Sequence, residues 1–189
     1  MKYLNSQALI MLFAVVVLSA CSQQQARKPV SHSEGSFMKE SVIRNKKMVA
    51  GEESKIDSIM KSDSARVYLP SKKGYWYAYL ERNTKDTLRP RKGDIAYFEY
   101  EVQDLDGHVI YSKLELRPQE YYVDQEQEIM MGLRHGIKLM RKKETVKFLF
   151  PSHMGYGYHG DKRRIGHNEP LICIVTLHDF RPENLTTPE

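Results

Sequence analysis

The sequence predicts an α+β fold in which an antiparallel β-sheet packs around one short helix. Three observations predict it. At least four segments have the apolar pattern of strands, only one short segment among them has a helical stripe, and the turn at Asp106-Gly107 joins two strands as a hairpin. Strands and helices do not alternate along the chain, which argues against a parallel nucleotide-binding sheet. The 189 residues are 41% hydrophobic and 28% charged, so we expect one globular domain with extra segments.

Residues 1–20 have the pattern of an export signal. Lys2 precedes an apolar run over residues 8–18, and small residues lead to Cys21. The run of about 11 residues is shorter than the roughly 20 that a membrane-spanning helix needs. The order Leu-Ser-Ala-Cys resembles the bacterial lipoprotein box, which implies that Cys21 carries acyl chains such as palmitate. A plain secretory signal cut near Ala20 and an uncleaved anchor are the alternatives.

Two segments precede the globular domain. Residues 21–45 are polar and predict a flexible tether from Cys21. Residues 46–65 predict an amphipathic helix, since apolar residues from Met48 to Met60 recur at helical spacing, although Gly51 weakens the pattern. The apolar stripe of this helix either packs on the following domain or pairs with a second copy of the chain.

The domain is expected over residues 74–181, followed by a tail over 182–189. Residues 74–81 alternate three tyrosines with Trp76, Ala78 and Leu80, which predicts a strand with two different faces. The next strand, over residues 95–104, places Tyr100 on its apolar face. A hairpin partner follows near residues 109–111, and residues 119–126 are a weaker strand candidate.

The second half of the domain contains the helix and two more strands. Ile129, Leu133, Ile137 and Met140 form one stripe on a short helix that contains two glycines, so packing must stabilise it. TVKFLF and LICIVTL follow as strands. Cys173 lies inside the last one, so we expect a buried structural thiol and no internal disulfide.

Charge and motif content exclude several classes of function. The net charge of +5 falls to +4 once Lys2 leaves with the signal, so the basic excess is mild and nucleic acid is not an expected partner. His153, His159 and His167, with Asp161 nearby, lack the spacing of HExxH or paired CxxC sites. The glycines around Tyr156 match neither a dinucleotide-binding nor a phosphate-binding loop. No metal and no cofactor are expected.

In this order, GYWYAYLE, LDGHVIYS, QEIMMGLRHGIKLM, FPSHMGYG and IGHNEPLICIVTL resemble an FKBP-type peptidyl-prolyl cis-trans isomerase domain over residues 74–181. With the lipoprotein box, the chain looks most similar to the gliding-motility-associated lipoprotein members of that family. The resemblance implies an isomerase, or rotamase, that acts on X-Pro bonds in the folding of exported or motility-related proteins. It needs no nucleophile, metal or cofactor, because the reaction is rotation about an amide bond.

The resemblance also assigns site residues. The catalytic positions fall on Tyr100, Met130 and Tyr156, with the Tyr156 hydroxyl and the Met130 backbone N–H as donors to the substrate. The substrate-binding positions fall on Ile110, Tyr111, Tyr121 or Tyr122, Ile129, Leu133, Ile165 and Cys173. Ile110, Tyr111, Leu133 and Cys173 depart from the family pattern. Fewer aromatic walls and a lost carboxylate at Tyr111 imply weaker catalysis than in the best members of the family. From pattern alone, Tyr100 is more simply a core residue.

Two classes of function stay open. One is a membrane-tethered isomerase in the cell envelope, facing the periplasm, with Ser22 after Cys21 compatible with sorting to the outer membrane. The other is a non-catalytic binding or chaperone module for an envelope complex. The expected partners are X-Pro polypeptides, the membrane through its lipid anchor, and a second copy through the N-terminal helix.

Overall fold

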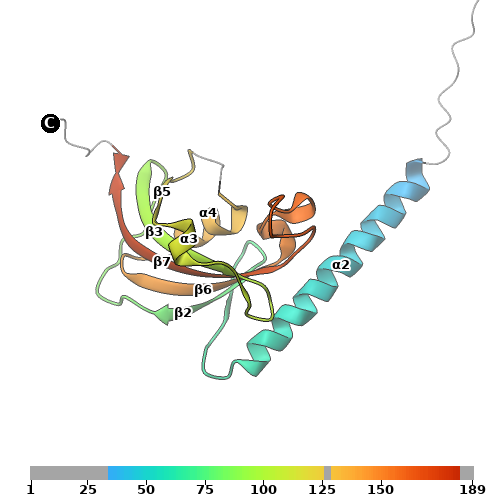
Figure 1. Ribbon diagram of the computed structural model, residues 1–189, viewed down its shortest axis with the longest axis horizontal. Helices are drawn as coiled ribbons and strands as arrows, with labels where there is room; N and C mark the ends of the chain where they lie inside the picture. The colour runs from blue at the N-terminus through green and yellow to red at the C-terminus, as the bar shows by residue number, and fades with distance from the viewer. Residues whose placement is uncertain (1–33, 126–128, 184–189) are drawn as a thin grey trace, which may run out of the picture. The chain divides into compact units, whose positions relative to one another are not determined.

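The computed structural model of the protein describes residues 34–125 and 129–183 (Figure 1). The elements in chain order are α2 Glu34–Ser62, β1 Leu69–Pro70, β2 Trp76–Glu81, β3 Asp94–Gln103, β4 Val109–Tyr111, α3 Lys113–Leu116, β5 Gln119–Tyr122, α4 Met131–Ile137, β6 Glu144–Phe150 and β7 Leu171–Pro182, with single 3-10 turns at Ser152–Met154 (η1) and Gly157–His159 (η2). The chain divides into two units at residues 41 and 42. The second contains the sheet and the α2 residues from Val42 onward. The predicted α+β class is confirmed.

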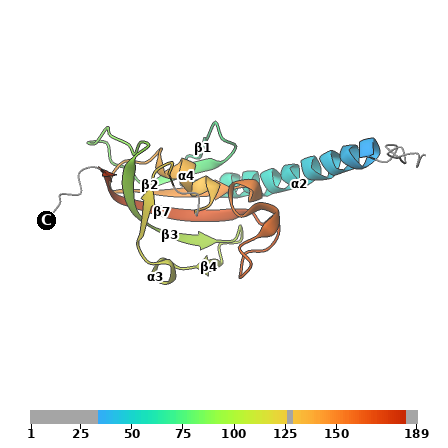
Figure 2. The ribbon, with the colours of Figure 1, turned by 90° about the horizontal axis from the view of Figure 1, so that it is seen from above.

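All strand pairs of the sheet are antiparallel, in the order β1-β2-β6-β7-β3-β4, and β5 pairs with β3. Figure 2 shows β7, β3 and β4 in this order across the sheet, with β2 beyond β7. The two long strands β3 and β7 pair from Asp94 to Gln103, with a register shift between Tyr97 and Phe98. Such shifts bend a strand, and in Figure 1 the sheet curves with α4 on its concave side.

The main core lies between α4 and the concave face of the sheet. Alternation along β6 directs Val146, Phe148 and Phe150 to this face. The rings of Phe148 and Phe150 stack at 5.3 Å, and Tyr75 meets Phe150 edge-on at 5.2 Å. Leu133 and Ile137 of α4 are completely buried against them. The aromatic β2 strand and the short apolar helix are therefore parts of one core.

Two glycines let α4 approach the sheet closely. A Cβ atom on Gly132 would lie 2.7 Å from the ring of Phe150, and one on Gly136 would lie 2.8 Å from the ring of Phe148. Both distances are shorter than a van der Waals contact, so neither ring leaves room for a side chain. The glycines lower helix propensity, and the close packing they allow offsets that cost.

A smaller cluster lies on the convex face. Leu149 and Ile172 alternate with the core residues of β6 and β7, so they point to the opposite side, where Ile56 of α2 covers them. Ile59, Met60 and Trp76 pack against these three residues. The α2 stripe therefore packs on its own domain at residues 56–60, which confirms one of the two alternatives for that segment.

The extent of α2 differs from the prediction. The helix runs over Glu34–Ser62 rather than residues 46–65, so residues 34–45, predicted as part of the tether, are helical. Phe37, Met38 and Val42 continue the helical spacing of the later stripe, and extending an existing helix costs much less than starting one. Cys21 and the rest of residues 1–33 lie outside the described residues. Across residues 34–125 and 129–183, no helix combines the length and apolar content needed to cross a membrane.

The sheet also begins earlier than residue 74, because β1 pairs with β2 through Leu69 and Tyr77. The Asp106-Gly107 hairpin is confirmed, since β4 pairs with β3. The weak candidate at residues 119–126 contains strand β5. The α3 turn after β4, which Ser112 caps, was not predicted, because a four-residue helix has too little periodicity to detect.

Candidate functional site

The residues that the resemblance selects come together near the N-terminal end of α4. Tyr100, Met130, Leu133, Ile165, Cys173 and Tyr121 are buried in the main core cluster, and Ile110, Tyr111, Ile129 and Tyr156 are half-buried against it. They come from β3, β4, β5, the start of α4, the loop between β6 and β7, and β7 itself. An apolar site with a tyrosine-rich edge is the result.

The ambiguity between Tyr121 and Tyr122 is resolved by burial. Tyr121 is completely buried in the core cluster, and its hydroxyl accepts a hydrogen bond from the N–H of Asp124 at 3.1 Å. Tyr122 is half-buried and lies outside that cluster. Neighbouring strand residues point to opposite faces, and only Tyr121 lies in the core cluster with the other candidate residues.

The loop that carries Tyr156 starts where β6 ends. Pro151 precedes the η1 turn, and Gly157, with a φ of 59°, follows Tyr156 in the left-handed region that glycine tolerates. Tyr156 is half-buried. Across the described residues its hydroxyl has no hydrogen-bond partner, and that oxygen is not buried, so it is free to donate to a ligand.

Burial keeps both site tyrosines protonated. It is the main cause that raises the pKa of Tyr156 to about 12, and it also raises the pKa of Tyr100 above its ordinary value, with a smaller contribution from Tyr156. The Tyr100 hydroxyl also has no partner in the part of the chain that the structure describes. At neutral pH each hydroxyl is therefore a hydrogen-bond donor rather than a base.

Met130 provides a third donor. It is the N-cap of α4, with extended backbone angles (φ −56°, ψ 146°), and its carbonyl accepts from the N–H of Arg134 at 3.2 Å. The N–H groups at a helix start have no partner inside the helix. Within residues 34–125 and 129–183, no hydrogen bond from the Met130 N–H is present.

Cys173 forms part of the buried wall. It is completely buried on β7, and burial raises the pKa of its thiol far above the ordinary value. The thiol therefore stays neutral and unreactive. The prediction of a buried structural thiol is confirmed.

Asp161 is a site residue that sequence reasoning missed. One oxygen of its carboxylate accepts the hydroxyl of Tyr111, and the other accepts the N–H groups of Arg163, Arg164 and Ile165 at 2.8, 3.0 and 2.9 Å. Partial burial alone would raise the pKa of Asp161, but the bonds from Tyr111 and the backbone hold it below its usual value.

Asp161 therefore brings a carboxylate from another segment to this edge of the site, but it does not take over the orientation of a pocket tyrosine. It bonds Tyr111 itself, and no bond joins it to Tyr100 or Tyr156. An aspartate that accepts from residues two to four positions later is a common loop-forming pattern, which was the available signal in DKRRI.

Arg164 joins the same loop to the β4 hairpin. Its guanidinium donates to the carbonyl of Ile110 at 2.8 Å, pairs with Glu115 at 2.6 Å, and lies 4.9 Å from the centre of the Tyr111 ring. One arginine therefore contacts both Ile110 and Tyr111, the two half-buried residues that differ from the family pattern. At Ile110 and Tyr111 the edge of the site is therefore held by polar contacts to Arg164 and Asp161.

The histidines do not gather into a metal site. His153 and His159 are exposed, and the Nδ1 atom of His167 contacts the carbonyl of Tyr158. Among the described residues, the group whose atoms lie close enough for a metal ion is Asp104, Asp106 and His108 in the β3–β4 turn. Asp104 there already accepts from His108 at 2.9 Å and from backbone N–H groups, so turn formation explains the group.

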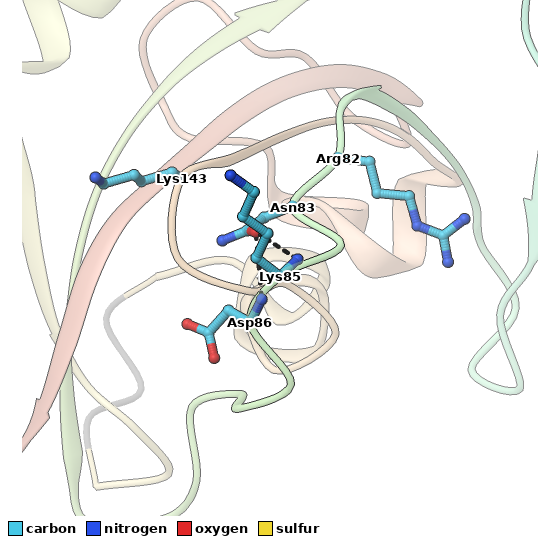
Figure 3. A pocket seen from close by; sticks show the side chains of 5 residues that line it. All are labelled: Arg82, Asn83, Lys85, Asp86 and Lys143. Carbon is cyan, nitrogen blue, oxygen red and sulfur yellow. Dashed lines mark hydrogen bonds between the residues drawn. The ribbon is translucent and has the colours of Figure 1, made fainter.

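A polar hollow lies elsewhere, after β2. Figure 3 shows the residues that line it, which are Arg82, Asn83, Lys85, Asp86 and Lys143. The Asn83 side chain accepts from the N–H groups of Lys85 and Asp86 at 3.0 and 3.3 Å, so the hollow is a by-product of a side-chain-capped turn. It contains none of the predicted site residues and has no apolar floor.

Comparisons with known proteins agree with this geometry. The sequence model of the family "FKBP-type peptidyl-prolyl cis-trans isomerase" matches residues 86–178. A curated relative from Haemophilus influenzae, "Probable FKBP-type peptidyl-prolyl cis-trans isomerase", is 26% identical over 151 residues. That match covers 73% of this chain, and the chain spans 61% of the length of the relative.

Solved structures show the same fold. FkpA from Escherichia coli has a TM-score of 0.59 at 20% identity, and the match covers 92% of this chain and 82% of that one. A peptidyl-prolyl cis-trans isomerase from Pseudomonas syringae pv. tomato has a TM-score of 0.57 at 17% identity, covering 71% and 94%. With the family match over residues 86–178, this part of the chain has the sequence pattern and the fold of an FKBP-type peptidyl-prolyl cis-trans isomerase domain.

Proposed function

We propose that the protein accelerates cis–trans exchange of X-Pro peptide bonds at the site between α4, β3 and the Tyr156 loop. The observation that carries the proposal is a set of three donors around an apolar cluster that have no partner among the described residues: the hydroxyls of Tyr100 and Tyr156 and the N–H of Met130. In the assignment, the proline ring lies against the apolar cluster, and Tyr156 donates to the carbonyl next to the rotating bond.

This arrangement suits a reaction whose barrier of roughly 18–20 kcal/mol is amide resonance. The planar amide separates charge between oxygen and nitrogen more than the twisted form does. A dry apolar surface therefore disfavours the planar form relative to the twisted one. Donors that are already in place at the carbonyl keep the peptide oriented while the bond rotates.

The catalysis that we propose is weaker than that of an aromatic-walled family member. Leu133 and Cys173 are small, completely buried side chains at positions where the resemblance expects aromatic ones. Arg164 and Asp161 brace Tyr111 at the edge. The substrate therefore meets less aromatic surface, which reduces the apolar contribution to binding.

The envelope location is part of the proposal. The export signal and the lipoprotein box support acylation of the chain at Cys21. The acyl chains would hold the protein at the outer membrane, with the domain facing the periplasm. A role in folding motility-related proteins is the narrower form of this proposal. Fractionation of cells that express wild type or Cys21→Ala tests the anchor: we expect the wild type in the outer-membrane fraction and the variant released from it. Wild type in the soluble fraction would contradict the anchor.

A second copy of the chain is the proposed partner for α2. Phe37 and Ile43 are each 66% exposed, and Met38 and Val42 are more than half exposed. Apolar side chains at helical spacing usually gain a covering partner. Sedimentation of the mature chain is expected to give a dimer that Val42→Lys with Ile43→Lys converts to a monomer. A monomeric wild type would refute this partner.

A non-catalytic binding module is the alternative, and the braced polar edge at Tyr111 favours it. Magnetisation transfer between the cis and trans signals of a short X-Pro peptide separates the two functions. An isomerase increases the exchange rate in proportion to protein concentration. Broadened peptide signals without faster exchange would leave only binding, and would refute the enzymatic proposal.

A further inference from the structure

The helix α2 reaches the base of the Tyr156 loop through a buried carboxylate. Glu52 is only 6% exposed, and Ser152, one hundred residues later, is 2% exposed. One oxygen of Glu52 accepts the backbone N–H of Ser152 at 2.8 Å, and the other accepts its hydroxyl at 2.7 Å. Across the described residues, no lysine or arginine pairs with Glu52, so these two bonds hold the carboxylate.

Buried carboxylates are rare, because taking a charge out of water is costly unless strong hydrogen bonds compensate. Bonds to an ionised acceptor are shorter and stronger than neutral ones. An apolar side chain at this position would fill the same space without the desolvation cost of a carboxylate. Packing alone therefore does not explain Glu52. The place of Ser152 at the base of the Tyr156 loop suggests a role for this buried carboxylate.

Ser152 opens the η1 turn that leads to Tyr156. Pro151, the residue before the turn, has no side chain that can cap it, and the turn closes through bonds from Met154 and Gly155 to Pro151 and Ser152. The N–H of Ser152 at the start of the turn would otherwise lack a partner. Glu52 of α2 supplies that partner. Ser152 lies four residues before Tyr156 in the chain.

The helix is fixed close to this contact. Ile56, one helical turn after Glu52, is completely buried on Leu149 and Ile172. Glu52 also lines a hollow of about 500 Å³, and Asn168 is among the other residues that line it. The N–H of Asn168 donates to the carbonyl of Gly157 at 2.9 Å. The α2 helix therefore contacts Ser152 before Tyr156 and shares a hollow with Asn168 after it.

We propose that Glu52 is a positioning residue for the reaction, and that α2 holds the Tyr156 loop in its donating geometry through Ser152. The proposal rests on the function proposed above, because Tyr156 is its catalytic group. A small displacement of a donor is enough to lose much of its effect on a reaction. The helix is then part of the active site rather than only a spacer between anchor and domain.

The test compares Glu52→Ala and Glu52→Gln with the matched control Glu53→Gln, whose side chain is exposed on the same helix. In full-length mature protein, we expect Glu52→Ala to lower kcat for an X-Pro peptide about fivefold to tenfold with KM nearly unchanged, since Glu52 does not touch the peptide. Glu52→Gln retains an acceptor for one Ser152 donor, so we expect an intermediate loss. Glu53→Gln is expected to match wild type.

A second measurement does not depend on catalysis. Amide hydrogen exchange of Glu52→Gln and Ser152→Ala is expected to increase over residues 152–157 and to stay at the wild-type level in β3 and β5. That result with an inactive wild type supports the contact and refutes only the isomerase function. Unchanged exchange at residues 152–157, or an equal increase throughout the sheet, would overturn the positioning role.

Discussion

The two faces of the sheet are built in different ways. On the concave side, α4 packs on stacked rings such as Phe148 and Phe150, and more than twenty residues are buried together with the site. On the convex side, α2 is attached by three fully buried side chains and by the Glu52–Ser152 bonds. The comparison indicates that stability resides mainly on the concave side, whereas the convex side contributes orientation to the loop that carries Tyr156.

The largest expected difference comes from adjacent residues on β6. Phe148 faces the concave core and Leu149 the convex cluster, and both are completely buried. We expect Phe148→Ala to lower the free energy of unfolding by about 3–5 kcal/mol and Leu149→Ala by about 2–3 kcal/mol, because the smaller cluster can collapse around the lost volume. Urea unfolding measures both. A larger loss for Leu149→Ala would reverse the comparison.

Two glycines sharpen the same contrast. Gly132 of α4 has no room for a Cβ atom, whereas a Cβ on Gly51 of α2 would meet nothing within 4 Å. We expect Gly132→Ala to destabilise the protein by about 1–3 kcal/mol through overpacking. Gly51→Ala should stabilise it by about 0.5–1 kcal/mol through helix propensity. Opposite signs in thermal unfolding support the account, and two shifts of the same sign would contradict it.

The smallest effect concerns the pH dependence of the site edge. The pKa of Asp161 is lower in the folded state than its usual value, so its bonds stabilise the fold at neutral pH, and this contribution is lost as the pH falls through the folded pKa. Asp161→Asn keeps the size of the side chain without that titration. Between pH 6 and pH 3 we expect wild type to lose up to about 1 kcal/mol more stability than the variant. Equal losses of stability in wild type and Asp161→Asn would contradict a stabilising role for the ionised Asp161.

The sequence predicted the strands and the core side chains because period-two alternation reports directly on which face is buried. The face of Tyr100 was predicted in this way, and the structure buries Tyr100 together with its β3 neighbours Phe98 and Val102. The Asp106-Gly107 hairpin followed from turn chemistry, which is also local. The predicted start of α2 was wrong. Residues 34–45 contain many polar side chains, so their apolar helical spacing is recognisable only when the whole helix is considered.

The candidate site divides in the same way. Family order predicted Tyr100, Tyr156 and Met130, and the structure gathers them in one cluster. Asp161 and Glu52 were not predicted, because their roles depend on partners fifty and one hundred residues away. The local turn at Asp161 has a signal in DKRRI, but the bond from a carboxylate to a distant hydroxyl or N–H leaves no spacing signal in one sequence.

The most direct test of the central claim is the exchange rate of an X-Pro peptide with Tyr156→Phe, with Tyr158→Phe as the matched control. Tyr158 lies two residues away in the same loop and is 70% exposed, outside the apolar cluster. Removing one donor is expected to lower kcat/KM about tenfold for Tyr156→Phe. Tyr158→Phe should equal wild type. Equal rates for all three proteins would contradict the claim that the Tyr156 hydroxyl drives the isomerisation.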